Sequence, residues 1–462
     1  MRKKIVLRFI ITSVLFFSLV IAIGYFLLRP KLDFNIILIS LDTLRADHVG
    51  AYGYNRNTTP FIDKLAANGI IFENAFAQSP NTAISHATML TSLQPMVHGV
   101  TPEHILGDEF VTLAEYLKEK GYKTGGFTTH GSWLTKKMGF AQGFDDFYSN
   151  FLSARGINEY VFEFLEKNTK NRFFLFVHYY DIHSDYNKLP YDTRTGYDTK
   201  FCKDYKGNFT GCKNDLCAST YLEEVNSKGR TIPKGDLEYI TALYDGGIAY
   251  TDHHVNRLFK RLKELNLFEN SLVIITSDHG EEFMEHARVL HTQLYNEVMH
   301  VPFIIKIPGK KEHTCIKTPV GVIDIMPTIL DIAGIKHKNL QGRSVLPVIT
   351  SAKEENGFVF STLCGLGPQW EFNIFVRNKE VGFFTRDKFT KFEMYNIKSD
   401  PDETINIANE KEKKTKKREC LKKAIAYHQE QKDIKKYFKH KRRKMLFTKE
   451  ERERLKSLGY LN

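Results

Sequence analysis

Two apolar runs in the sequence each end abruptly in acidic residues. Residues 36–39 and 272–275 are short, continuous runs of Ile, Leu and Val, which are typical of buried strands in a parallel sheet. The first run is followed by Asp42, and the second by Asp278 and His279. Because ligands bind beyond the carboxyl ends of strands in open α/β sheets, we expect these side chains to meet in one site. An alternative is that each acid caps a helix that follows its strand.

Strand-like runs and helical patterns alternate through the rest of the first 340 residues, which indicates an α/β fold. The predicted strands are residues 70–76, 173–177 and 301–305, and the predicted helices are residues 59–67, 85–93, 239–268 and 323–333. Thr59 precedes Pro60 and is predicted to cap the first of these helices.

The pattern changes after Arg343, where four short runs separated by polar turns are typical of antiparallel strands. These runs are residues 358–363, 372–376, 381–385 and 392–395. They predict a small second subdomain.

The N-terminus contains an apolar stretch from Ile5 to Leu28, interrupted by Arg8 and a few small polar residues. About 20 apolar residues are enough to span a bilayer. No cleavage site of small residues follows, so we expect an uncleaved single-pass anchor, with the rest of the chain on the extracytoplasmic side (periplasmic, extracellular or lumenal). A cleaved signal peptide is the alternative.

The formal net charge of +12 comes from one segment. Between Lys411 and Lys444, 16 Lys and Arg residues stand against 4 Asp and Glu residues, so the rest of the chain is neutral. This basic tail, residues 410–462, is predicted to be a charged helix pair or partly disordered. It could contact anionic lipid head groups or a polyanionic glycan, or it could be a solvated helical surface. The charge pattern does not indicate a nucleic-acid partner.

Hydroxyl residues stand at the entry of the helix predicted over residues 85–93. Thr82 is placed to present its oxygen where backbone N–H groups and the helix dipole receive an anion, with Ser85 and His86 one turn further on. The alternative is an ordinary helix cap made by the Thr82 or Ser85 oxygen.

Several blocks in the chain, between Asn35 and about Asn409, resemble the sulfatase family of the alkaline-phosphatase superfamily. The blocks are Leu41–Asp47, Ser277–Glu282, His291–Glu297, Val322–Thr328, Met394–Asn396 and Asp400–Glu403. Their order is that of the family. The resemblance implies a large, mixed, mostly parallel sheet flanked by helices, with a small C-terminal antiparallel-sheet subdomain.

The resemblance also implies boundaries. We expect an anchor over residues 1–30, a catalytic domain over 33–340 with an insertion at 184–232, a C-terminal α+β subdomain over 341–409, and the basic tail over 410–462.

The nucleophile motif departs from the family pattern. Sulfatases of the usual kind carry a Cys or Ser that is oxidised to formylglycine, whereas the aligned residues here are Thr82-Ala83-Ile84-Ser85-His86. Threonine cannot give formylglycine by that route, so none is expected. The residue types resemble those of phosphotransferases of the same superfamily, such as lipoteichoic acid synthase, which use a metal-bound Thr alkoxide.

The resemblance assigns roles to the site residues. Metal ligands are expected at Asp42, Asp278, His279 and Thr82; catalytic residues at Thr82, His183, His291 and His86; and substrate-binding residues at His130 and Ser85. One divalent cation is expected, and Ca²⁺, Mn²⁺, Zn²⁺ and Mg²⁺ all suit carboxylate and imidazole ligands.

These observations predict a membrane-anchored, metal-dependent hydrolase of sulfate or phosphate esters that uses a metal-bound Thr nucleophile. A phosphotransferase that modifies a lipid or cell-surface glycan is the second hypothesis. A non-catalytic glycan- or lipid-binding pseudo-sulfatase is the third.

Overall fold

The computed structural model describes most of the chain after residue 32. The described residues are 33–129, 133–184, 190–192, 196–203, 205–207, 209, 218–351, 353–363, 372–438, 443–445, 448 and 452. Within them, no helix combines the length and the apolar character needed to cross a membrane. The predicted anchor over residues 5–28 and the predicted site residue His130 lie outside the described residues.

The main sheet has eight strands in the order β11-β2-β10-β7-β1-β6-β4-β5. They are β1 Asn35–Leu41, β2 Ile70–Phe72, β4 Lys123–Thr128, β5 Asp146–Ser149, β6 Phe173–Tyr179, β7 Ser271–Ser277, β10 Phe303–Lys306 and β11 Thr314–Ile316. The strand β1 lies between β6 and β7 and is parallel to both, while β10 is antiparallel to β7 and β2. The prediction of a mixed, mostly parallel sheet is therefore confirmed.

The helices of the described residues differ somewhat from the predicted ranges. Their bounds are α2 Pro60–Ala66, α3 Thr82–Thr91, α4 Pro95–His98, α5 Leu113–Glu119, α6 Ala154–Lys167, α7 Ala218–Lys228, α8 Lys234–Glu264, α9 Asn296–Met299, α10 Ile325–Ile332, α11 Leu346–Ser351 and α12 Lys414–Tyr437. The helix predicted over 239–268 begins five residues earlier, at Lys234, and ends at Glu264.

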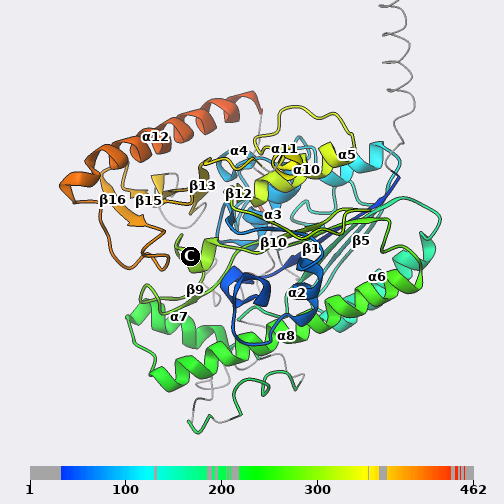
Figure 1. Cartoon of the computed structure of the whole chain (residues 1–462), viewed down its shortest axis with the longest axis horizontal. Helices are drawn as coiled ribbons and strands as arrows, with labels where there is room; N and C mark the ends of the chain where they lie inside the picture. Colours follow the sequence, from blue (N-terminus) through cyan, green and yellow to red (C-terminus); the bar gives the residue numbers. More distant parts are fainter. Residues whose placement is uncertain are drawn as a thin grey trace, which may run out of the picture. The chain divides into compact units, whose positions relative to one another are not determined.

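Alternate side chains of β1 enter two different hydrophobic cores, as expected for a strand buried on both faces. Ile36 and Leu38 belong to a core that includes residues of α3 and α10. Ile37 and Ile39 belong to a second core that includes residues of α2, α6 and α8. Figure 1 shows α2, α6 and α8 below the sheet and α3 and α10 above it. The central strand is therefore fixed from both sides.

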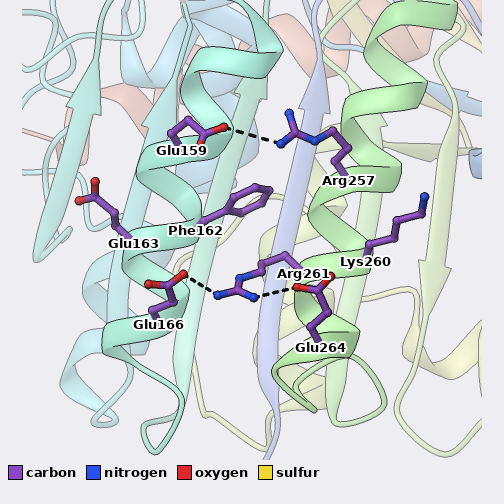
Figure 2. A pocket seen from close by; sticks show the side chains of 8 residues that line it. All are labelled: Glu159, Phe162, Glu163, Glu166, Arg257, Lys260, Arg261 and Glu264. Carbon is purple, nitrogen blue, oxygen red and sulfur yellow. Dashed lines mark hydrogen bonds and ion pairs between the residues drawn. The ribbon is translucent and has the colours of Figure 1, made fainter.

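A groove between α6 and α8 is lined by charges that are largely paired with one another (Figure 2). Arg257 lies 3.7 Å from Glu159, and Arg261 lies 2.6 Å from Glu166 and 2.7 Å from Glu264. Such solvent-exposed pairs contribute little stability individually. They join the two helices on the outer surface, and the four acidic and three basic side chains of the groove nearly balance one another.

The four strands predicted after Arg343 are confirmed. They are β13 Val359–Thr362, β14 Ile374–Arg377, β15 Val381–Arg386 and β16 Lys391–Asn396, paired in this order and all antiparallel. The basic helix α12 packs on this sheet through Cys420, Ala424 and Tyr427. Two short strand pairs complete the described sheets: β3 Ala75–Phe76 with β12 Val320–Gly321, and β8 Glu282–Phe283 with β9 Val289–Leu290.

Thr59 occupies the N-cap position of α2, as predicted, but its side chain makes no capping hydrogen bond, and a residue of another helix supplies the acceptor. The Thr59 hydroxyl bonds to Asp63 and accepts a hydrogen bond from the Gly50 N–H instead. The carboxylate of Asp252, on α8, accepts hydrogen bonds from the backbone N–H groups of Phe61 at 3.1 Å and Ile62 at 2.9 Å. This contact joins α2 to α8 and satisfies donors that the first turn of a helix leaves unpaired.

Replacing Asp252 with Ala should lower the free energy of unfolding by about 1–3 kcal/mol, because two buried N–H groups of α2 lose their acceptor. Denaturant or thermal unfolding measures the change. Glu238→Ala, an exposed substitution on the same helix, should change it by less than about 0.5 kcal/mol. Equal stability of the two variants would contradict the capping role.

Candidate active site

The ends of β1 and β7 bring three predicted metal ligands together. The two strands are parallel with Leu41 opposite Ser277, so the residues that follow them lie at the same edge of the sheet. One ligand atom from each of Asp42, Asp278 and His279 lies within 4.8 Å of the others, and all three residues are buried. Segments far apart in the sequence thus form a single cluster, as the two acidic strand ends predict.

The electrostatics of this cluster favour a bound cation. Burial raises the pKa of Asp42, and the nearby negative charge of Asp278 raises it further. Burial would also raise the pKa of Asp278, but the imidazoles of His279 and His86 hold it below its usual value. Among the described residues, Asp42 Oδ1 and Asp278 Oδ2 have no hydrogen-bond partner. Buried anionic oxygens without partners are costly, so this donor set fits a divalent metal ion.

His279 is held in the tautomer that a metal ligand needs. Its Nδ1 lies 3.0 Å from the carbonyl oxygen of Gly280. A carbonyl can only accept, so Nδ1 carries the hydrogen and Nε2 presents its lone pair. Nε2 is 3.5 Å from Asp278 Oδ2 and 3.5 Å from the Thr82 hydroxyl oxygen. The ring therefore points its unprotonated nitrogen into the cluster.

Thr82 is the first residue of α3, and its hydroxyl faces the cluster. The cap of α3 is Asn81, whose side chain accepts from the Ile84 N–H at 3.3 Å, so neither Thr82 nor Ser85 makes the cap. The alternative of an ordinary cap at these two residues was wrong. Ser85 is fully buried and donates its hydroxyl to the carbonyl oxygen of Asp278 at 2.7 Å. It joins α3 to the end of β7, and its predicted contact with substrate stays a prediction.

His86 is buried one turn further along α3. Its Nδ1 donates to the Thr82 carbonyl oxygen at 2.8 Å, so its Nε2 accepts from the Ser40 hydroxyl at 2.9 Å. Burial, together with the neighbouring His178, lowers its pKa to about 3, so the ring is neutral at neutral pH. Both ring nitrogens are engaged with protein groups, which fixes α3 against β1.

His178 contacts the metal cluster directly, although the sequence patterns did not single it out. It lies on β6 and its Nε2 is 3.1 Å from Asp42 Oδ2. Burial lowers its pKa to about 4, so a neutral ring donates this hydrogen bond to the carboxylate. A signal was present: the apolar run of β6 ends in a polar residue beside the end of β1, as the two metal strands do.

The two predicted substrate histidines approach the cluster from different elements. The rings of His183 and His291 have centroids 5.3 Å apart, and the ring of His291 is 4.5 Å from that of His279. The Tyr180 hydroxyl is 2.9 Å from His183 Nδ1. Glu281 Oε2 is 3.2 Å from His291 Nδ1, and both groups are buried. Glu281 and Tyr180 are further residues that the sequence patterns missed, and each orients a ring.

The chain matches a family model and many known proteins. The model described as Sulfatase matches residues 34–335. Arylsulfatase K of Canis lupus familiaris is 31% identical over 204 residues, covering 41% of this chain and 37% of the relative. The chain thus matches little more than a third of the length of this relative. The protein named "Uncharacterized sulfatase YidJ" of Escherichia coli (strain K12) is 25% identical, and the match covers 81% of this chain and 83% of that protein.

Solved structures show the same fold. A protein in complex with its substrate D-glucosamine-2-N,6-O-disulfate has a TM-score of 0.69 at 20% identity, covering 87% of this chain and 98% of that chain. A phosphonate monoester hydrolase of Agrobacterium radiobacter has a TM-score of 0.69 at 19% identity, covering 86% of this chain and 96% of that chain. With most of the catalytic domain matched by the family model and the metal cluster at its strand ends, the chain belongs to the sulfatase family.

Proposed function

We propose that the protein is a membrane-anchored, metal-dependent hydrolase of sulfate or phosphate esters in which the Thr82 hydroxyl oxygen is the nucleophile. The observation that carries this proposal is the position of that oxygen, 3.5 Å from His279 Nε2, a nitrogen that belongs to the same cluster as the Asp42 and Asp278 carboxylates. Asp42, Asp278 and His279 would hold one divalent cation. When bound, it supplies positive charge that lowers the pKa of a nearby hydroxyl and stabilises charge on the transferred group.

The protein groups provide the remaining chemistry. The Thr82 hydroxyl gives up its proton to solvent, its oxygen forms a bond to sulfur or phosphorus as the bond to the ester oxygen breaks, and a threonyl ester results. His291, oriented by Glu281, gives a proton to the departing oxygen. Water then attacks the threonyl ester, which releases sulfate or phosphate and restores the hydroxyl. His183 contacts the oxygens of the transferred group.

The residue set also supports a second candidate, transfer of a phosphoryl-bearing group to an alcohol. A threonine with an Asp–His pair resembles the phosphotransferases of the superfamily, and no formylglycine can form at Thr82. Substrate screening with aryl sulfates, phosphate monoesters and diesters, and phosphonates separates the ester classes. Analysis of the products separates free inorganic anion from a transferred group.

The remaining parts of the proposal concern location. The apolar stretch over residues 5–28 supports a single-pass membrane anchor with the catalytic domain on the extracytoplasmic side. The substrate is then an ester on a glycan or lipid outside the cytoplasm. One structural neighbour has a sulfated glucosamine as its substrate, which supports a glycan.

Thr82→Ala should lower turnover by about a thousandfold or more, because the reacting oxygen is removed while the metal ligands remain. Steady-state kinetics on the substrate found by the screen measures it. Thr82→Ser keeps a hydroxyl and should retain measurable turnover. Unchanged turnover in the Ala variant would contradict the proposed nucleophile.

The purified protein should hold about one divalent cation per chain, and Asp278→Asn should hold much less, because one anionic ligand becomes neutral. Elemental analysis after dialysis measures the content. Added metal should raise the melting temperature of the wild type more than that of the variant, since binding stabilises the folded state. Asp331→Asn, on the exposed side of α10, is the matched control and should match the wild type. Equal metal content in wild type and Asp278→Asn would contradict the site.

His291→Asn should slow hydrolysis of alkyl esters more than that of 4-nitrophenyl esters, because a poor leaving group depends more on proton donation. The effect should be about a hundredfold or more on the alkyl ester. Glu281→Gln should act in the same direction but less. The surface variant His337→Asn should leave both rates unchanged. An equal loss on both substrates would assign His291 to binding rather than proton transfer.

A further inference from the structure

A pocket of about 250 Å³ lies at the end of the main sheet opposite the metal cluster. It lies next to the beginning of β7, at Phe268 and Glu269, and to the end of β10, at Lys306, whereas Asp278 follows the other end of β7. Its charged lining consists of Lys64, Lys263, Lys306, Lys310, Lys311 and Glu269, and it is called the lysine pocket below.

The lysine pocket has a surplus of positive charge. Five lysines face a single carboxylate, and within the described part of the chain none of these lysines forms an ion pair with an acidic side chain. The groove between α6 and α8 is different, because its arginines lie against glutamates (Figure 2). Like charges gathered around one cavity repel each other, and an anion bound among them removes that repulsion.

Two of the cations lie close to one aromatic ring. The ammonium groups of Lys306 and Lys263 lie 4.4 Å and 4.9 Å from the ring centroid of Phe268. Lys306 is buried, and its Nζ donates to the carbonyl oxygens of Phe268, Glu269 and Ser271 at 2.7, 3.1 and 3.3 Å. Lys306 is therefore fixed in the wall of the pocket, whereas the other four lysines are exposed or half-buried.

The lysine pocket is also next to the point where the chain enters the sheet. The N–H of Asn35, the first residue of β1, donates to the carbonyl oxygen of Asn270 at 2.9 Å, and Asn270 follows the pocket residue Glu269. In the sequence, only residues 29–34 separate Asn35 from the predicted membrane helix. Six residues reach at most about 20 Å even when fully extended.

We propose that the lysine pocket binds the phosphate group of an anionic phospholipid. This inference rests on the membrane anchor of the proposed function but not on its chemistry. Lysine clusters close to a membrane-spanning segment attract anionic lipids in this way. Because β7 is seven residues long, the metal cluster lies about 20 Å from the pocket along the strand, so the two are separate sites.

The test uses the full chain in an uncharged detergent, with bound lipid counted by native mass spectrometry. The probes are dihexanoyl phosphatidylglycerol, dihexanoyl phosphatidylcholine and glycerol 3-phosphate. The test variant combines Lys263→Gln, Lys310→Gln and Lys311→Gln, and leaves the buried Lys306 in place. The matched control combines Lys414→Gln, Lys422→Gln and Lys432→Gln, which removes the same charge from exposed positions of α12.

The wild type should bind phosphatidylglycerol saturably and more tightly than either other probe, and the pocket variant should bind it at least about tenfold more weakly. The α12 control should bind as the wild type does. Thr82→Ala should also bind as the wild type does, so a failure of the proposed chemistry leaves this result unaffected. An equal loss in the α12 control, no loss in the pocket variant, or equally tight binding of glycerol 3-phosphate would overturn the proposal.

Discussion

The structure depends on keeping two carboxylates, Asp42 and Asp278, close together in a place that water does not reach. Such a pair is unfavourable by itself, because burial and mutual repulsion both oppose the charged forms. A divalent cation reverses that balance, since the same two charges and the His279 lone pair then become its ligands. The parallel pairing of β1 and β7 therefore positions the backbone of the site. A bound cation would balance the negative charge of the two carboxylates.

A layer of neutral, hydrogen-bonded groups supports these ligands. His178 donates to Asp42, and Ser85 donates to the backbone of Asp278. His86 bonds on one side to the Thr82 backbone and on the other to Ser40 of β1, which fixes the beginning of α3 beside the cluster. Groups of this kind orient metal ligands and set their basicity. Because burial keeps both imidazoles uncharged, they hold the site without adding positive charge that would compete with a cation.

The sequence predicts the parts of this arrangement that depend on local pattern. Continuous apolar runs ending in acids located β1, β7 and the cluster at their ends, and alternating short runs located β13 to β16. Contacts between distant elements are harder to predict from the sequence. The carboxylate of Asp252 caps α2 from 190 residues away, where the local sequence favoured Thr59. His178 contacts Asp42 only because β6 lies beside β1. Both contacts depend on tertiary packing. The polar end of the β6 run was a signal for His178, whereas the sequence around α2 contains no signal for Asp252.

The position of β1 has a consequence for how the chain acquires its structure during synthesis. This strand is the first of the sheet to leave the ribosome, yet both of its partners, β6 and β7, come much later. Its two apolar faces and its backbone N–H and C=O groups must wait for those segments. A chain of such long-range pairings folds slowly and exposes aggregation-prone surface meanwhile. Assembly of the domain therefore has to be completed late, after most of the polypeptide has been made.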